Sequence, residues 1–572
     1  MIDLRRLLES RLFTAFAALD PDADPVLRPS DRADFQANGA LALAKRLGRK
    51  PREVAEEVCS HLDLEGICSL VEVSGPGFIN LFLDPQFLAA ELARAATEGL
   101  GVPPEGSPLR VVVDYSHPNV AKEMHVGHLR TTIIGDALCR ILTYCGHEVI
   151  RENHIGDWGT PFGMLIEHLL DIGESEAAQE LSVGDLTSFY RQARISFDAD
   201  EEFKERSRRR VVLLQSGDEE TLRLWRVLVA ESVGYFNEVY RKLGVTLTDS
   251  DIVGESFYNA DLPPLVEELR QKRLLVESDG ALCVFPPGFV ARDEAPLPLI
   301  VQKSDGGFGY AATDLAAIRD RVGRLKADLI LYVVGAPQEQ HLAMCFAVAK
   351  MAGWLDDGVI ADHVAFGSVL GADHKMLKTR AGESIKLVSL LDEAILRAQA
   401  ALAERSSDLG EQERAAVARA IGIGAVKYAD LSTERTRDYV FDWDRMLAFE
   451  GNTGPYLQYA HARICSIFRR SGAARPAARE ARLDTPQERE LAVALLGLPE
   501  AIRATVRDRS PNRLCAYLFE VATIFTTFYE QCPVLRAESE ERREDRLLLC
   551  SLTAAVLATG LGLLGIEAPE RM

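Results

Sequence analysis

The spacing of apolar and polar positions divides the chain into three segments. In the first, residues 1–108, two helical patterns precede two strand-like stretches: Leu41–Leu47, Val54–His61, Ile67–Val73 and Gly75–Leu83. A period of 3.6 is typical of a helix that buries one face, and alternation is typical of a half-buried strand. We therefore expect a small α+β domain, which ends in the turn-rich sequence GVPPEGSP.

The second segment, residues 109–400, alternates strand and helix patterns. The apolar stretch LRVVVDY leads into a polar loop, a helical pattern over Leu129–Tyr144 and a second strand, HEVIR; LILYVVGA and HVAFGSVLG continue the series. This alternation predicts a Rossmann-type, doubly wound parallel sheet, which binds ligands at the carboxyl ends of its strands. Mixed patterns at about residues 165–300, including the charged sequence EEFKERSRRRVVLL, indicate an insertion.

The third segment, residues 401–572, is almost free of strand patterns. Five amphipathic stretches follow one another: Arg414–Tyr428, Leu457–Arg469, Glu488–Arg507, Arg513–Gln531 and Leu547–Leu564. They predict an all-α bundle. No uninterrupted apolar run comes near the roughly 20 residues that a membrane span needs, so we expect no membrane segment.

Composition narrows the class of protein. A chain of 572 residues is too long for one hydrophobic core, so several domains are expected. Its ten cysteines form no CxxC pair and no Cys/His cluster, which argues against a disulfide framework and against a zinc module. The amino end lacks the apolar block and cleavage site of a signal peptide, so we expect a cytoplasmic protein.

The charge balance bears on nucleic acids. A net charge of −21 argues against a protein that coats nucleic acid nonspecifically, because phosphate neutralisation requires surface Lys and Arg. Any site for a polyanion must therefore be local. Only 13 of the 65 basic residues are lysines, so a lysine kept in a loop is a candidate for function.

The loop after the first strand of the predicted sheet carries the sequence HVGH. His125, Gly127 and His128 lie where this loop meets a helix, and the amino end of a helix attracts anions through its free N–H groups and its dipole. Gly127 allows the backbone to approach a nucleotide, and the two imidazoles can donate to phosphate oxygens. Taken alone, the pair could also be surface histidines or two metal ligands.

A second loop, much later in the chain, carries the sequence KMLKT. It contains Lys375, Met376 and Lys378 and follows another strand pattern. Two of the scarce lysines thus share one glycine-flanked loop, where they could neutralise a triphosphate as charge builds on its pyrophosphate leaving group. A solvated basic loop is the alternative.

HVGH followed by KMLKT resembles the HIGH and KMSKS signatures of class I aminoacyl-tRNA synthetases, with Leu377 and Thr379 in place of the two serines. Five further sequences resemble the arginyl-tRNA synthetases in particular: NVAKEMHVGHLRTTIIGD, NHIGDWGTPFG, LKTRAGESIKL, NTGPYLQYAHAR and LGLLGIEAPERM. In addition, GALALAKRLGRKPREVA resembles the amino-terminal domain peculiar to that family. The resemblance covers nearly the whole chain.

The resemblance implies an arginine–tRNA ligase. Such an enzyme activates L-arginine with ATP and transfers it from arginyl adenylate to the 2′-hydroxyl of the terminal adenosine of tRNA(Arg), with activation dependent on bound tRNA. We expect Mg²⁺ to accompany ATP without a dedicated protein site, and we expect a monomer. The alternatives are a class I-type ligase for another substrate and an RNA-binding relative without catalysis.

Arginine carries a planar guanidinium with five donors, so its pocket requires carboxylates and carbonyl acceptors. The resemblance assigns six residues to this pocket, the first three at the guanidinium and the next two at the α-amino and carboxylate end: Asp114, Tyr310, Asp314, Asn119, Gln338 and His341. Most of these polar residues also have a structural explanation, such as a turn or a helix end. Asp114 stands where a longer glutamate is common.

The resemblance adds four residues to the ATP site. Lys122 corresponds to a lysine thought to compensate for degenerate KMSKS loops, although this chain carries both features. Gly156, Asp157 and Trp158 are expected to shape the adenosine side. A buried tryptophan loop would give the same pattern.

The resemblance places tRNA contacts in the first and third segments. In this family the bundle binds the anticodon, and four residues could stack on unstacked bases or bond to them: Tyr456, Gln458, Tyr459 and Arg463. Phe78 and Asn80 match a base-reading pair of the amino-terminal domain, which touches the tRNA elbow. Packing alone would also explain Phe78.

Overall fold

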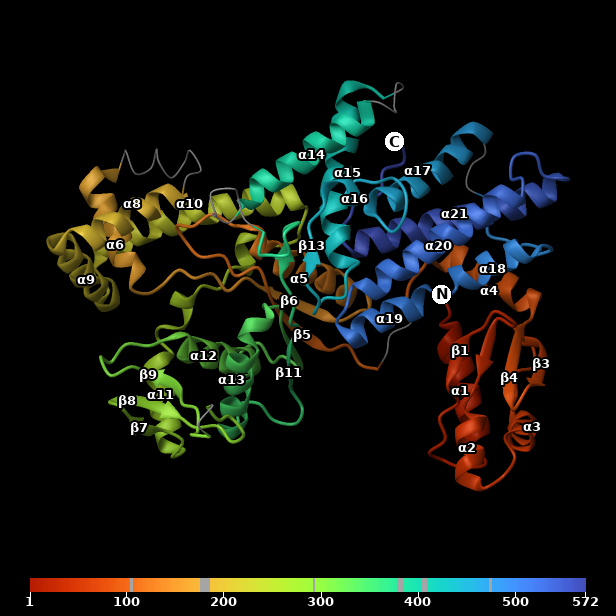
Figure 1. The fold of residues 1–572 in the computed structure, drawn as a ribbon, viewed down its shortest axis with the longest axis horizontal. Helices are drawn as coiled ribbons and strands as arrows, with labels where there is room; N and C mark the ends of the chain where they lie inside the picture. The colour runs from red at the N-terminus through yellow and green to blue at the C-terminus, as the bar shows by residue number, and fades with distance from the viewer. Residues whose placement is uncertain (103–105, 175–185, 292–293, 378–384, 404–408, 473–475) are drawn as a thin grey trace. The chain divides into compact units, whose positions relative to one another are not determined.

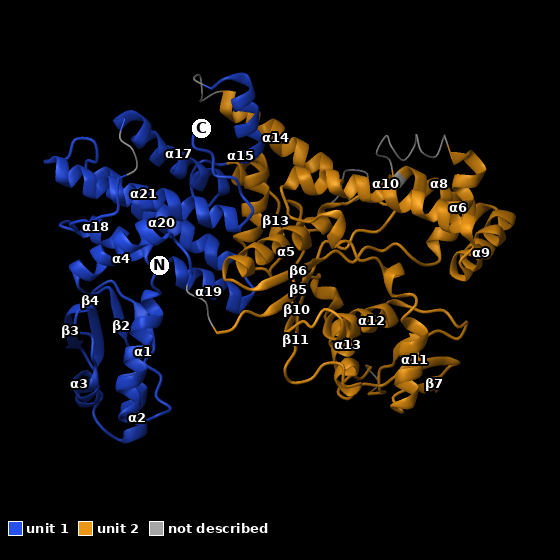
Figure 2. Ribbon diagram, turned by 180° about the vertical axis from the view of Figure 1, so that it is seen from behind, with its two compact units in different colours: residues 1–105, 405–421, 448–572 blue, residues 106–404, 422–447 orange. Residues whose placement is uncertain are grey.

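The structure is a computed structural model that describes residues 1–102, 106–174, 186–291, 294–377, 385–403, 409–472 and 476–572 (Figure 1). These residues form two units (Figure 2). Unit 1 combines residues 1–105, 405–421 and 448–572, and unit 2 combines residues 106–404 and 422–447.

Unit 2 contains four parallel strands: β5 (Arg110–Asp114), β6 (Glu148–Glu152), β10 (Leu329–Tyr332) and β11 (Ile360–His363). They lie in the order β11–β10–β5–β6. The three valines of β5 and every residue of β10 are buried, as expected for strands covered on both faces. This arrangement confirms the predicted doubly wound parallel sheet.

The loops after β5 and β10 leave the sheet at the same edge. Asp114, the last residue of β5, stands in register with Tyr332, the last residue of β10. Helix α5 (Val126–Tyr144) connects β5 to β6, whereas η3 (Ala336–Gln338) and α13 (Glu339–Met351) follow β10. The order of connections reverses between β5 and β10, which is where such sheets open a crevice for ligands.

The stretch HVAFGSVLG differs from the single strand that its sequence predicts. Only His363 belongs to the sheet, and Val369–Leu370 forms a separate short strand, β12, which pairs in parallel with β13 (Tyr439–Val440). Between them the backbone of Gly367 lies against Arg437, since a Cβ on Gly367 would come within 2.7 Å of the Arg437 carbonyl carbon. After His363 the chain therefore leaves the parallel sheet and packs against the segment that contains Arg437 and β13.

The insertion is a group of helices followed by a small antiparallel sheet. Its elements are α6 (Pro161–Ile172), α8 (Leu186–Ala199), α9 (Glu201–Ser216), α10 (Glu219–Leu243), η1 (Asp249–Asp251), η2 (Glu255–Tyr258), α11 (Leu262–Gln271), β7 (Val276–Ser278), β8 (Ala281–Val284) and β9 (Leu299–Gln302). Helix α12 (Tyr310–Gly323) then leads back to β10. In α9, Arg206 binds Asp171 at 2.7 Å and Arg210 binds Glu167 at 2.7 Å. These arginines hold α9 on α6.

The amino-terminal part of unit 1 confirms the predicted α+β architecture. An antiparallel sheet in the order β1–β2–β4–β3 is accompanied by four helices. The elements are α1 (Leu4–Ala17), β1 (Leu27–Pro29), β2 (Phe35–Ala37), α2 (Ala40–Leu47), α3 (Pro51–His61), β3 (Cys68–Ser74), β4 (Phe78–Leu83) and α4 (Pro85–Glu98).

The carboxyl-terminal part of the chain is helical, as predicted. Its helices are α14 (Leu387–Ala403), α15 (Glu411–Leu431), α16 (Trp443–Met446), α17 (Gly454–Ser471), α18 (Pro486–Leu495), α19 (Leu498–Asp508), α20 (Asn512–Gln531) and α21 (Glu540–Leu563). The single helix predicted over residues 488–507 is divided into α18 and α19. Pro499 lacks the N–H that would continue α18, so it begins a new helix instead.

One helix in the described part of the chain, α21, is long and apolar enough to cross a membrane. Within the protein, 72% of its most apolar stretch is buried, and it packs against α17, α18 and α20. Its apolar surface is therefore used in the core of the bundle.

Candidate active site

The HVGH sequence forms the first turn of α5. His125 is the residue before the helix, and its Nδ1 accepts a hydrogen bond from the Gly127 N–H at 3.0 Å. The His125 N–H donates in turn to Nδ1 of His128 at 3.1 Å, and the two ring centroids lie 4.1 Å apart. Because both Nδ1 atoms accept, each neutral ring carries its proton on Nε2.

The electrostatic environment keeps both rings neutral. Burial lowers the pKa of His128 to about 3, with a further contribution from His125. Burial also lowers the pKa of His125, and the nearby Lys122 acts in the same direction. Near neutral pH the two imidazoles can therefore donate through Nε2–H to an anion at the amino end of α5.

Backbone hydrogen bonds join HVGH to the end of the loop that begins with KMLKT. The Val126 N–H donates to the Ile385 carbonyl at 3.1 Å, and the Leu387 N–H donates to the Met124 carbonyl at 2.9 Å. In addition, Lys386 Nζ lies 2.9 Å from a carboxylate oxygen of Glu123. Segments far apart in the sequence thus meet at the predicted phosphate site.

The start of the KMLKT sequence is exposed. Lys375 and Met376 follow β12, and the Lys375 carbonyl accepts from the Gly371 N–H at 2.8 Å. Lys378, the second lysine of the sequence, lies outside the described residues.

The loop between β5 and α5 holds three non-glycine residues in the left-handed region: Ser116 (φ 82°), His117 (φ 52°) and Ala121 (φ 58°). Such conformations cost roughly 1–3 kcal/mol each and cluster at functional sites. Neighbouring side chains maintain them, since Ser232 Oγ accepts from the Ala121 N–H at 2.9 Å. In the same loop Lys122 is exposed, with Nζ 4.4 Å from the centre of the Tyr190 ring.

Asp114 already binds a guanidinium within the protein. The buried Arg321 donates from Nη2 to Asp114 Oδ2 at 2.8 Å and from Nε to Glu152 Oε2 at 2.6 Å. Burial pushes the pKa of Asp114 up, but Arg321 and two nearby histidines outweigh it, so the net shift is downward. The other oxygen, Oδ1, is buried without a hydrogen bond and lies 3.5 Å from Nδ1 of His117.

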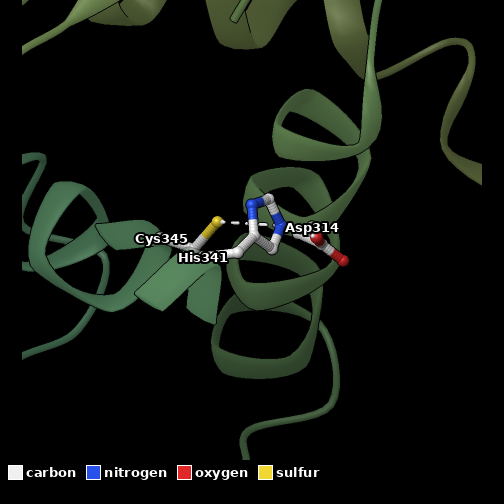
Figure 3. Close-up of side chains that lie close together, drawn as sticks. All are labelled: Asp314, His341 and Cys345. Carbon is white, nitrogen blue, oxygen red and sulfur yellow. Dashed lines mark hydrogen bonds and ion pairs between the residues drawn. The ribbon is translucent and has the colours of Figure 1, made fainter. Parts of the chain in front are cut away.

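Asp314 and His341 lie together at the meeting of α12 and α13 (Figure 3). Asp314 Oδ2 is 2.6 Å from Nε2 of His341, and this hydrogen bond raises the pKa of the imidazole. The Sγ atom of Cys345 lies 3.7 Å from the same nitrogen. Within the described ranges, this is the one group of three such side chains whose donor atoms are close enough to share a metal ion.

Two other predicted pocket residues are exposed. Tyr310 is 75% exposed in the first turn of α12, four residues before Asp314, so both side chains lie on one face of the helix. Gln338 is exposed directly before α13.

Gly156 permits a close approach that its sequence position alone does not reveal. Its N–H and carbonyl bond to Pro118 and Val120 at 3.0 Å each, and a Cβ at this position would lie 2.4 Å from Asn119 Oδ1. Glycine is therefore required for Asn119, which is exposed beside it, to keep its position.

Asp157 and Trp158 connect the loop after β6 to Ser256 and to Trp225 of α10. The Asp157 carboxylate accepts from the Ser256 N–H at 2.8 Å and from its hydroxyl at 2.6 Å, and burial raises the pKa of Asp157 against these bonds. Trp158 packs edge-on against Trp225, whose Nε1 donates to the Asp157 carbonyl at 2.7 Å. The Asp157 carboxylate is thus engaged in packing.

Glu255, which the sequence did not mark as a candidate, lies near Asp157 and Asp314. Burial is the largest cause that raises the pKa of Glu255 to about 8; the neighbouring acids Asp157 and Asp314 contribute, against a hydrogen bond from the Trp158 backbone. No local pattern marks Glu255, because its acidic neighbours come from separate segments of the chain. This group of acids accordingly contains one more carboxyl group than the sequence suggests, and its raised pKa keeps it protonated near neutral pH.

The predicted tRNA-contacting residues of α17 have different environments. Gln458 is fully buried, and its Nε2 donates to the carbonyls of Ala420 at 2.9 Å and Glu567 at 2.8 Å. Tyr456 is half-buried, whereas Tyr459 is 45% exposed. Arg463 stacks on the ring of Tyr529 at 4.6 Å. Gln458 is therefore a packing residue in this structure.

Phe78 and Asn80 lie at the start of β4, where Phe78 is half-buried. Asn80 is only 3% exposed; it donates to Ser74 Oγ at 2.9 Å and accepts from Gln36 Nε2 at 2.7 Å. Its amide is thus bonded within the sheet.

Comparison with known proteins gives concordant matches. Family models match residues 99–443 (tRNA synthetases class I (R), catalytic domain), 457–572 (DALR anticodon binding domain) and 3–83 (arginyl tRNA synthetase N terminal domain). The arginine–tRNA ligase of Thermobifida fusca is 56% identical over 572 residues, which is 100% of this chain and 99% of that one. The arginine–tRNA ligase of Klebsiella pneumoniae subsp. pneumoniae is 49% identical over the full length of both chains.

Solved structures agree with the sequence matches. The arginyl-tRNA synthetase of Plasmodium falciparum superposes with a TM-score of 0.88 at 30% identity, covering all of both chains. That of Thermus thermophilus superposes with a TM-score of 0.82 at 28% identity, again over both full chains.

Proposed function

The chain belongs to the arginyl-tRNA synthetase family, and from that membership we propose how its own residues carry out the reaction of an arginine–tRNA ligase. The enzyme joins arginine to tRNA(Arg) and uses ATP. We propose that it does so through arginyl adenylate, that the 2′-hydroxyl of the terminal adenosine is the acceptor, and that activation depends on bound tRNA.

The phosphates of ATP bind at the amino end of α5. The Nε2–H groups of His125 and His128 donate to phosphate oxygens, because both Nδ1 atoms are engaged with the backbone. Lys375 and Lys378 neutralise the charge that develops on pyrophosphate, with Lys122 as an additional cation. Mg²⁺ enters with ATP as part of the substrate.

The guanidinium of arginine binds between Tyr310, Asp314 and Glu255. The observation that carries this assignment is the pKa of Glu255, which burial and two neighbouring acids raise to about 8. A cation bound beside these acids would stabilise the ionised form of Glu255. Asp114 contributes through its bond to Arg321 and shapes the floor of the pocket. Asn119 and Gln338 hold the α-amino and carboxylate end, and His341 orients Asp314.

The chemistry follows from this placement. A carboxylate oxygen of arginine bonds to the α-phosphorus of ATP while the bond from that phosphorus to pyrophosphate breaks. The acceptor hydroxyl of tRNA then attacks the arginyl carbonyl, and AMP leaves. Positioning and electrostatic stabilisation suffice for both steps, without a covalent enzyme intermediate.

The tRNA contacts that we propose are made by side chains that are exposed or half-buried. In the bundle, Tyr456, Tyr459 and Arg463 face the anticodon, whereas Gln458 supports α17 from behind. Phe78 stacks on a base of the elbow, and Asn80 fixes the strand that presents it. We further propose domain boundaries at residues 1–108, 109–400 and 401–572 and a monomeric, cytoplasmic enzyme.

ATP–pyrophosphate exchange tests the assignment directly. With each standard amino acid offered in turn, exchange should require both arginine and tRNA(Arg). Exchange driven by another amino acid would contradict the substrate, and exchange with arginine alone would contradict the dependence on tRNA.

A further inference from the structure

A carboxylate, an imidazole and a thiol lie close together at Asp314, His341 and Cys345 (Figure 3). Binding of a guanidinium requires acceptors such as the carboxylate, and it does not explain the thiol. His341 and Cys345 are four residues apart on α13, so their side chains share one face of the helix, and Asp314 reaches them from α12. One carboxylate oxygen, one imidazole nitrogen and one sulfur all lie within 4.8 Å of one another.

These three atoms are a ligand set for a soft divalent ion. Zn²⁺ binds oxygen and nitrogen at about 2.0–2.2 Å and sulfur at about 2.3 Å in a tetrahedron, which separates a nitrogen from a sulfur by roughly 3.6 Å. His341 Nε2 and Cys345 Sγ are already 3.7 Å apart. Asp314 and His341 are 2.6 Å apart and would open to roughly 3.4 Å, as the ion replaces the proton that now joins them.

The group is accessible from one side only. Cys345 is fully buried, whereas the side chains of His341 and Asp314 remain 29% and 25% exposed. An ion can therefore enter past the carboxylate and imidazole, with the fourth position left to water on the exposed side.

A second His–Cys pair in the chain, His461 and Cys465, has a similar geometry but no carboxylate beside it that completes a set of three ligands in the described residues. His461 and Cys465 are also four residues apart on one helix, with Nε2 and Sγ 3.6 Å from each other. In the described part of the chain this pair belongs to no group of three close ligand atoms, and its imidazole Nδ1 bonds to the Pro569 carbonyl. The two pairs differ in Asp314 and in access, since His461 is only 4% exposed.

We propose that Asp314, His341 and Cys345 bind one soft divalent cation of the Zn²⁺ class, and that the bound ion excludes arginine from the pocket. Binding releases the thiol proton of Cys345 to solvent. The proton between His341 Nε2 and Asp314 moves to Nδ1 of a neutral ring, or leaves to solvent from a protonated ring, and no redox step is involved. The exclusion of arginine rests on the proposed role of Asp314 at the guanidinium. The binding of the ion does not.

Titration with Cd²⁺ tests the site without any substrate. The full chain, freed of metal and kept reduced by a phosphine, should develop the ultraviolet charge-transfer absorption of a Cd²⁺–thiolate bond. Loss of a group that merely supports a metal ligand weakens binding by roughly 10- to 100-fold, so Cys345→Ser should weaken it at least about 10-fold. Cys345→Ala, a second variant in case serine destabilises the core, should behave alike.

Cys465→Ser is the matched control and should leave the titration unchanged. A titration curve that is the same in the wild type and both Cys345 variants would overturn the site, as would one that is lost only in Cys465→Ser.

Arginine then tests exclusion. Rising L-arginine should displace Cd²⁺ from the wild type, with an apparent dissociation constant that increases in proportion to arginine. Cd²⁺ binding that saturating arginine leaves unchanged would overturn exclusion. These results are distinguishable from failure of the proposed function, which would appear as absent exchange with arginine, tRNA(Arg), ATP and Mg²⁺ in enzyme that holds no Cd²⁺ or Zn²⁺.

Discussion

At the scale of single residues, the raised pKa of Glu255 indicates a position where a cation can bind. Its pKa in the folded protein is about 8, against an ordinary value of 4.5. Between these values the folded state holds a proton that the unfolded state has released, so the contribution of Glu255 to stability falls as pH rises through this window. A bound guanidinium would favour the ionised carboxylate and would release the proton.

Arginine should therefore bind more tightly as pH rises towards about 8 and should level off above it. The gain is at most about tenfold per pH unit. Isothermal titration in two buffers of different ionisation enthalpy should detect proton release in the wild type below about pH 8. In Glu255→Gln the affinity should be weaker and nearly independent of pH; a wild-type affinity that is flat across this range would contradict the assignment.

Glu255→Gln should also change how the free energy of unfolding depends on pH. Glu255→Gln should gain stability relative to the wild type as pH rises from about 5 to about 8, since the cost of ionising the buried acid is removed. Urea unfolding at several pH values measures this difference.

Gly156 offers a prediction that depends on space rather than charge. Gly156→Ala places a Cβ 2.4 Å from Asn119 Oδ1, so Asn119 must move. A displacement near 1 Å can cost on the order of 100-fold in activity, and we expect the KM for arginine in pyrophosphate exchange to rise at least about tenfold. Gly323→Ala, where a Cβ meets open space, is the control; equal KM values for the two variants would count against the role of Asn119.

Sequence alone found the residues whose signal is local. HVGH was recognisable because its three candidate positions lie within four residues at the start of one helix. Glu255 was not, because its two acidic neighbours come from distant segments. Neither was the partner of Asp114, because Asp114 ends strand β5 and its partner Arg321 lies on helix α12. The family resemblance places Gln458 among the residues that contact tRNA, whereas in the structure its side chain is buried and donates to two backbone carbonyls.

At the scale of elements, Arg130 ties α5 to the segment that supports the KMLKT loop. Its guanidinium is buried against Asp430 at 3.1 Å and donates to the Arg437 carbonyl at 3.0 Å. It also lies 5.3 Å from the centre of the Tyr439 ring in β13. Because β13 pairs with β12, the helix that carries HVGH and the strand that enters the KMLKT loop share one anchor.

Arg130→Met should destabilise unit 2 by about 3–5 kcal/mol, since it leaves the buried charge of Asp430 without a partner. Urea unfolding measures this loss. Replacing Arg194, whose partner Asp198 is solvent-exposed on the same helix, should cost less than about 1 kcal/mol. Equal losses for the two variants would show that the anchor contributes no more than a surface pair.

The prediction of elements succeeded where periodicity was long and failed where the chain changes direction. Alternating apolar strands and amphipathic helices were sufficient for the parallel sheet and the bundle. The split between α18 and α19 depends on Pro499 within a continuous amphipathic pattern, and the departure of HVAFGSVLG from the sheet depends on contact between Gly367 and Arg437. Neither feature can be predicted from the spacing of apolar residues.

At the scale of the molecule, unit 1 joins two parts of the chain that are proposed to bind tRNA. Arg489 of α18 donates to Asp34 at 2.5 Å and to the Leu83 carbonyl at 2.6 Å, which fixes the amino-terminal sheet to the bundle. Arg503 forms a second ion pair with Asp3. Two binding modules held in one body add their contacts with little further loss of entropy.

Arg489→Ala should therefore raise the KM for tRNA(Arg) in aminoacylation, by roughly tenfold, and should leave the KM for arginine unchanged. Arg49→Ala is the control, because its partner Glu57 lies in the same amino-terminal part. A KM for tRNA that does not change in Arg489→Ala would indicate that the two parts bind independently of this contact.

The pairing of distant segments in unit 2 has a consequence for the growing chain on the ribosome. Arg110, at the start of β5, bonds to Asp328, 218 residues later, and the HVGH backbone completes its bonds only when Ile385 and Leu387 have emerged. A nascent chain that ends before Asp328 lacks β10, which pairs with β5, and one that ends before Ile385 still lacks the segment that bonds to the proposed phosphate site. We therefore expect a chain that is interrupted before Ile385 to consume no ATP.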